Sequence, residues 1–110
     1  IIRGGLNIFA EELEHLLLQH PAIMAAVVIG MPDERLGERA CACLVSNPGE
    51  SFAIADARQF FQELGVAKYK WPEFIIPFDG FPLNSVGKLD RRAIAKTAHT
   101  LLARKQEEGS

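Results

Sequence analysis

The chain has 110 residues, of which 48% are hydrophobic and 24% are charged, and its formal net charge is −2. This size fits one domain rather than a complete large enzyme, and this composition excludes a disordered, collagen-like or membrane-spanning class. The nearly neutral charge argues against a general nucleic-acid binder, and the lack of a signal peptide or a long apolar run leads us to expect a cytoplasmic protein.

The first twenty residues predict two kinds of structure. Residues 1–8 begin with apolar residues that are interrupted by Gly4 and Gly5, which predicts an extended pair of short strands. From Phe9 onward the apolar residues recur at helical spacing and glutamates fill the first turns, which predicts an amphipathic helix that ends near Pro21.

Two apolar runs follow this helix. Residues 23–30 and 39–45 are separated by a turn over residues 31–37, so we expect a pair of hairpin strands. Cys41 and Cys43 lie two positions apart in the second run, and in a strand they would face the same side and not bridge easily. We interpret them as small core residues in a reducing compartment.

The second half predicts a helix, an edge strand and a final helix. The apolar face of its first helix ends at Gly65, which suits a left-handed cap, and the basic and aromatic residues 68–72 come next. Residues 73–79 have the composition of a strand, which Pro77 places at a sheet edge. Asp90 is well placed to cap the final helix.

Together these elements predict a single α+β domain over residues 1–110, with a small three-stranded sheet flanked by helices and a short N-terminal two-stranded hairpin.

The charge is distributed unevenly along the chain. Residues 1–67 contain four basic and nine acidic residues, a net charge of −5, whereas residues 68–110 contain eight basic and five acidic residues, a net charge of +3. We therefore expect an anionic ligand to meet the second half.

The loop over residues 80–89 carries the strongest chemical signal. Lys88 follows Gly87 among turn-forming residues, so its ammonium group can extend away from the domain and stabilise an oxyanion as a compact point charge. On composition alone, a solvated surface lysine is the favoured interpretation. A Walker phosphate loop is excluded, because its first glycine and the Ser or Thr after the lysine are missing.

Four separated motifs follow one another along the chain. They are Arg3-Gly4-Gly5-Leu6-Asn7-Ile8, then Glu12-Leu13-Glu14 with His20-Pro21, then Met31-Pro32-Asp33-Glu34-Arg35-Leu36-Gly37-Glu38, and last Tyr69-Lys70-x-Pro72 with Pro82-x-x-x-x-Gly87-Lys88-x-x-Arg91. In order and spacing these motifs resemble the C-terminal domain of the adenylate-forming superfamily, which includes acyl- and aryl-CoA ligases, peptide-synthetase adenylation domains and luciferases.

The resemblance implies the small, mobile C-terminal domain of an ATP-dependent acyl- or aryl-CoA ligase, whose large N-terminal domain is not in this sequence. Such ligases join a carboxylic acid to ATP as an acyl-adenylate, the small domain rotates, and a pantetheine thiol then attacks. ATP and CoA are therefore the expected substrates, with Mg²⁺ held mainly by the N-terminal domain, which is the expected partner. The 110 residues alone are expected to be inactive.

The resemblance also assigns the lysine loop its roles. It implies that Lys88 bridges the substrate carboxylate and the α-phosphate during adenylation, as the catalytic residue. Gly87 and Arg91 would support the loop, Arg91 by pairing with carboxylates, although Arg91 could also be simply solvated.

The remaining expected contacts involve the acceptor thiol and CoA. By resemblance, Gly4 and Gly5 lie beside the pantetheine tunnel, where a missing Cβ permits close approach; a tight turn is the alternative reason for this pair. Tyr69, Lys70 and Trp71 would lie near the CoA nucleotide, where the aromatic rings could stack on adenine and the lysine could meet a phosphate. Packing in the core is the alternative for Tyr69 and Trp71.

Two other functions stay open. Glu73 occupies a position where some relatives are basic, and an acid there would repel a CoA phosphate. The acceptor could therefore be the pantetheine of a carrier protein, or the reaction could stop at the adenylate. A non-catalytic interaction module is the third reading. The resemblance implies that the N-terminal domain selects the acid that is activated.

Overall fold

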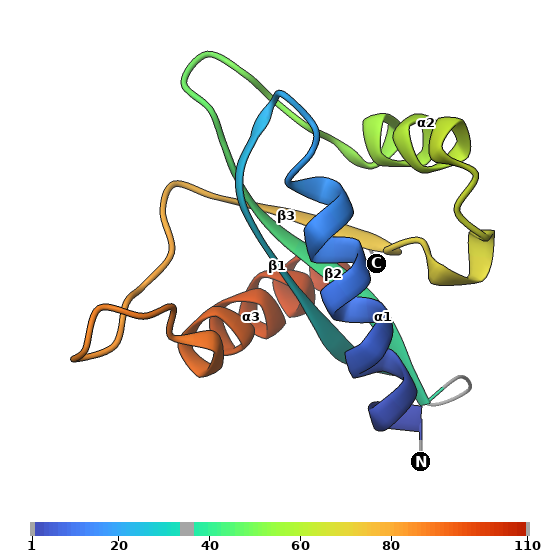
Figure 1. Cartoon of the computed structure of the whole chain (residues 1–110). Coiled ribbons are helices and arrows are strands. Elements are labelled where there is room, and N and C mark those ends of the chain that lie inside the picture. The colour runs from blue at the N-terminus through green and yellow to red at the C-terminus, as the bar shows by residue number, and fades with distance from the viewer. Residues whose placement is uncertain (1, 34–36, 110) are drawn as a thin grey trace.

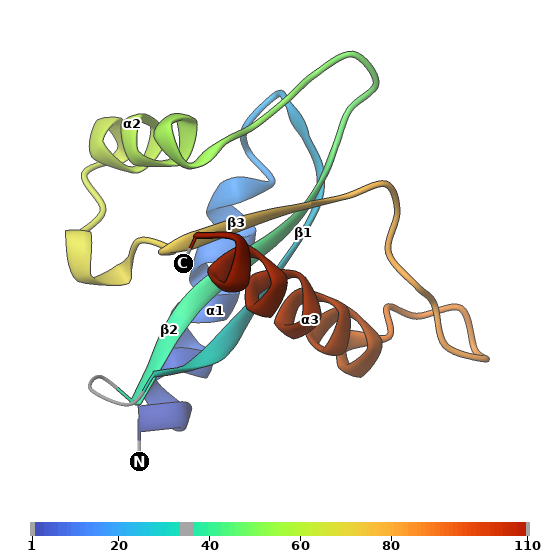
Figure 2. The ribbon, with the colours of Figure 1, turned by 180° about the vertical axis from the view of Figure 1, so that it is seen from behind.

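A computed structural model describes residues 2–33 and 37–109 of the chain. The elements follow in the order α1 (Ile2–Leu17), β1 (Ile23–Asp33), β2 (Gly37–Ser46), α2 (Ile54–Leu64), the 3-10 turn η1 (Lys68–Lys70), β3 (Phe74–Phe78) and α3 (Arg91–Gly109). Helix α1 covers one face of the sheet and α3 covers the other (Figures 1 and 2). The predicted α+β class, a three-stranded sheet flanked by helices, is confirmed.

The sheet has the strand order β1-β2-β3. β1 and β2 form the antiparallel hairpin that the two apolar runs predict, and β2 pairs in parallel with β3. Residues 34–36 of the predicted turn lie outside the described residues. Pro77 lies in β3, a strand with a neighbour on one side only, as its missing N–H predicts.

Strand β2 separates two hydrophobic clusters. Ala42 and Leu44 belong to the cluster under α1 and α2, whereas Cys41 and Cys43 belong to the cluster under α3. Both cysteines are free and fully buried, which confirms the prediction that they are core residues on one face. A hydrogen bond with Cys43 and burial raise the pKa of the Cys41 thiol above its ordinary value, which favours the protonated thiol.

The start of the chain differs from the prediction. Residues 2–8 belong to helix α1 instead of an extended pair, and residue 1 lies outside the described residues. The reason is that the apolar stripe of Ala10, Leu13 and Leu17, all buried, continues one turn back to Leu6 in the sequence. Extending an existing helix needs no new nucleus, and two interior glycines cost it only about 1 kcal/mol each.

The predicted turn over residues 31–37 is shorter in the structure, because β1 runs to Asp33 and β2 begins at Gly37. The predicted end of α2 and start of α3 are confirmed. Helix α2 ends at Gly65, whose φ of 74° is left-handed. Helix α3 begins after Asp90, whose Oδ1 accepts a hydrogen bond from the Ala93 N–H at 3.0 Å. Asp90 therefore fixes where the loop of Lys88 joins the body of the domain.

Candidate functional site

The loop that carries Lys88 is a small internally bonded hairpin. Leu83 and Leu89 form an antiparallel bridge. Asn84 Oδ1 accepts hydrogen bonds from the N–H groups of Val86 and Lys88, both at 3.0 Å, and the Asn84 N–H donates to the Lys88 carbonyl at 2.7 Å. Asn84 therefore organises the loop from within. Sequence reasoning counted it only as a turn former, although an Asn three residues before a glycine is a signal of such a turn.

Gly87 closes the turn. Its φ is 84°, in the region that side chains disfavour, and its N–H donates to the Asn84 carbonyl at 3.0 Å. A Cβ added at this position would meet no atom within 4 Å. The need for glycine is therefore a matter of backbone conformation and not of space.

The lysine loop projects from the sheet as the orange segment between β3 and α3 (Figures 1 and 2). Lys88 is exposed at this loop. In the part of the chain that the structure describes, no carboxylate or other acceptor contacts its ammonium group. Leu83, Val86 and Leu89 beside it are 60%, 75% and 39% exposed. A bare cation bordered by apolar side chains suits contact with a second surface.

Arg91 lies at the base of the loop, at the first position of α3. Its Nη1 and Nη2 donate to the two carboxylate oxygens of Glu14 at 3.1 and 3.0 Å. This hydrogen-bonded pair raises the pKa of the Arg91 guanidinium above its ordinary value. Arg91 thus pairs with a carboxylate, but sequence reasoning did not identify Glu14 as the partner.

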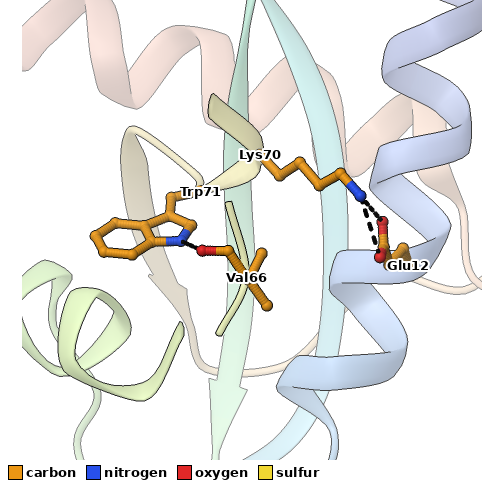
Figure 3. Close-up of polar contacts among 4 residues, drawn as sticks. All are labelled: Glu12, Val66, Lys70 and Trp71. Atoms are coloured by element: carbon orange, nitrogen blue, oxygen red, sulfur yellow. Dashed lines mark hydrogen bonds and ion pairs between the residues drawn. The ribbon is translucent and has the colours of Figure 1, made fainter. Parts of the chain in front are cut away.

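The basic and aromatic segment is arranged differently (Figure 3). The Lys70 ammonium lies 3.2 Å from Glu12 Oε2 on α1. The Trp71 indole N–H donates to the Val66 carbonyl at 2.8 Å, and its ring packs against the cluster under α1 and α2. Trp71 therefore packs against the core, as the alternative interpretation expected, whereas the Tyr69 side chain is 75% exposed.

The structure does not bring all the predicted site residues together. Gly4 and Gly5 lie in the N-terminal turns of α1, with no positive φ, so the tight turn considered for them is wrong. Figures 1 and 2 show the start of α1 and the lysine loop at different ends of the molecule. A tunnel beside these glycines stays a prediction.

Two further properties concern residues 2–33 and 37–109. No group of three or more His, Cys, Asp or Glu side chains there is arranged to hold a metal ion. No helix in this part of the chain has both the length and the apolarity to cross a bilayer.

The fold and the loop define a class: a small α+β domain that carries an exposed lysine on a hairpin loop. The model of the AMP-binding enzyme C-terminal domain matches residues 12–88, and the chain belongs to this family. It is 44% identical over 101 residues to a vibriobactin-specific 2,3-dihydroxybenzoate-AMP ligase of Vibrio cholerae, across 92% of this chain and 19% of that protein.

Two further proteins are similar to this chain over most of its length. The chain is 44% identical over 97 residues to a medium-chain fatty-acid-CoA ligase of Escherichia coli, across 87% of this chain and 17% of that protein. The structure of apo MbtA of Mycobacterium smegmatis superposes with a TM-score of 0.72 and 38% identity, across 79% of this chain and 16% of that one. The chain thus spans less than a fifth of each of these proteins.

Proposed function

We propose that the chain is the C-terminal domain of an adenylate-forming ligase that activates a carboxylic acid with ATP and transfers the acyl group to the pantetheine thiol of CoA. Lys88 is its catalytic residue. The observation that supports this most strongly is the exposed Lys88 ammonium on an internally bonded loop, within the motif that resembles the lysine motif of the family. Membership of the family supplies the reaction class.

The proposed chemistry follows from the charge of Lys88. In adenylation a carboxylate oxygen forms a bond to the α-phosphorus, the bond to the β-phosphate oxygen breaks, and pyrophosphate leaves with the electron pair. A unit charge at ~4 Å is worth about 4 kcal/mol at an effective dielectric of ~20. Only the part that grows in the transition state accelerates the reaction. Lys88 holds the two anions together and stabilises the charge that develops on the phosphate oxygens.

The test is Lys88→Ala in the full-length ligase. ATP-pyrophosphate exchange is expected to fall by about 10²-fold or more, while thioester formation from supplied acyl-adenylate changes far less. Lys96→Ala, an exposed lysine on α3, is the matched control and should leave both half-reactions unchanged. An equal fall of both half-reactions in Lys88→Ala would contradict the assignment. The 110-residue chain alone should show no exchange, because its ATP site is incomplete.

The acceptor thiol has a second candidate. The Lys70 ammonium is paired with Glu12 and the Trp71 ring is packed inward, so two of the three residues expected near the CoA nucleotide are engaged within the domain. This favours the pantetheine of a carrier protein. The relatives include both an AMP ligase and a CoA ligase by name. Turnover of the full-length ligase with CoA, compared with turnover on a holo carrier protein, distinguishes the two acceptors.

A cytoplasmic location stays a prediction.

A further inference from the structure

Three hydrogen-bond donors converge on the carboxylate of Glu14. Arg91 supplies two of them, and the backbone N–H of Val28 supplies the third, to Oε2 at 2.7 Å. The Glu14 side chain is only 12% exposed, although the Arg91 side chain is 56% exposed. Glu14 is therefore a largely buried acceptor and not a solvated surface acid.

The position of Val28 explains why this arrangement matters. Val28 lies in β1, which has a neighbouring strand on one side only. Its N–H bonds to Glu14 of α1, so the carboxylate takes the place of an acceptor from a further strand. The same carboxylate holds Arg91 of α3. Since α1 and α3 cover opposite faces of the sheet, Glu14 joins the two helical layers around the β1 edge (Figures 1 and 2).

The link continues into the lysine loop. Arg91 follows Asp90, whose N–H donates to the Pro82 carbonyl at 2.9 Å and whose side chain caps α3. Pro82 and Asp90 are thus the two ends of the loop hairpin. The direction of the hairpin relative to the sheet depends on how the first turn of α3 is held, and Glu14 holds it.

We propose that Glu14 is a positioning residue that sets the orientation of Lys88 through Arg91. This rests on the proposed role of Lys88 in adenylation. A carboxylate suits the position because it only accepts hydrogen bonds, and all three groups that face it are donors. A glutamine of the same shape has one oxygen and one NH2 group, so it leaves at least one of the three donors facing another donor.

The experiment compares Glu14→Gln and Arg91→Gln with the control Glu12→Gln, which removes the exposed ion pair to Lys70. In the 110-residue chain, ¹⁵N heteronuclear NOEs report the order of residues 83–89, and amide exchange reports the Val28 N–H. We expect Glu14→Gln and Arg91→Gln each to lower the loop NOEs and the control to leave them unchanged. Protection of the Val28 amide should fall by about tenfold or more in Glu14→Gln alone.

In the full-length ligase, Glu14→Gln and Arg91→Gln should each lower pyrophosphate exchange by about tenfold, with a non-additive double variant, and leave thioester formation from supplied adenylate within about twofold. Unchanged loop NOEs in both variants, even with Val28 protection lost, would overturn the positioning role. Arg91→Gln keeps the Glu14 carboxylate and its hydrogen bond from the Val28 N–H, so it decides the question if Glu14→Gln fails to fold. If Lys88→Ala leaves exchange unchanged, the proposed function fails, while the loop NOEs still decide whether Glu14 orients the loop.

Discussion

The two basic segments in the second half of the chain, residues 68–71 and 82–91, place their lysines in different electrostatic surroundings. The Lys70 ammonium is paired with Glu12 and its neighbour Trp71 is packed inward, whereas Lys88 is exposed and no described acid contacts it. Helix α1 supplies an acid to a cation in each segment. Glu12 and Glu14, two positions apart and hence on different sides of the helix, take Lys70 and Arg91 respectively. The comparison teaches that the surrounding acids, more than the density of basic residues, decide which lysine can act on an outside anion.

After loss of Lys88 itself, Asn84→Ala is expected to have an effect about as large as that of Glu14→Gln. The substitution removes the oxygen that accepts from the Val86 and Lys88 N–H groups, so the loop loses its internal support. Pyrophosphate exchange in the full-length ligase should fall by about tenfold because Lys88 is misplaced. Ser85→Ala, at the adjacent position of the same loop, is the control. Full exchange activity in Asn84→Ala would show that loop order is irrelevant to the lysine.

Gly87→Ala should have a smaller effect. Alanine at a φ of 84° costs about 1–2 kcal/mol, which the exposed loop can relieve by shifting Lys88. We expect exchange to fall by a few-fold with an unchanged Tm. Gly49 has a φ of 80° in a turn outside the lysine loop, so Gly49→Ala imposes similar strain as a control. Equal losses of exchange in the two variants would refute a specific role for the turn.

In the other basic segment the expected effect is on stability. Trp71→Phe keeps an aromatic ring but removes the donor to the Val66 carbonyl, a cost of about 1 kcal/mol. For a domain of this size that corresponds to a Tm lower by about 4–8 °C. Differential scanning calorimetry measures it. Loss of CoA turnover with an unchanged Tm would instead favour a ligand contact for Trp71.

Glu12→Gln should have the smallest effect on stability, about 0.5 kcal/mol, because its ion pair is exposed. The substitution also makes the surroundings of Lys70 more like those of Lys88, because it removes the carboxylate that faces the Lys70 ammonium. If Lys70 meets a CoA phosphate, the KM for CoA in the full-length ligase should fall while kcat stays constant. A KM for CoA that does not move would remove Lys70 from the acceptor site.

Local rules predicted most of the fold. The apolar runs of the hairpin, the glycine after α2, the proline in the edge strand and the aspartate before α3 each act on their own segment of the chain, so their effects are visible in the sequence. The prediction of an extended pair at the N-terminus was wrong because two local signals compete there. The glycine pair favours an extended break, whereas the apolar stripe favours a longer helix, and the stripe prevails.

The site was predicted only in part for a related reason. Lys88 belongs to a short motif and was visible, but the ion pair of Arg91 with Glu14 joins residues 77 positions apart. The pair of Lys70 with Glu12 joins residues 58 positions apart. Such partners depend on how α1 packs against the sheet, and the sequence pattern does not specify which glutamate of a helix reaches which cation.

The most direct test is a crystal structure of the full-length ligase bound to an acyl-adenylate analogue. The account predicts that Lys88 Nζ lies within hydrogen-bonding distance, about 2.7–3.2 Å, of the acyl or phosphate oxygens. Glu14 should still hold Arg91 in that complex. An ammonium group that points into solvent while another residue supplies the positive charge at the phosphate would contradict the account.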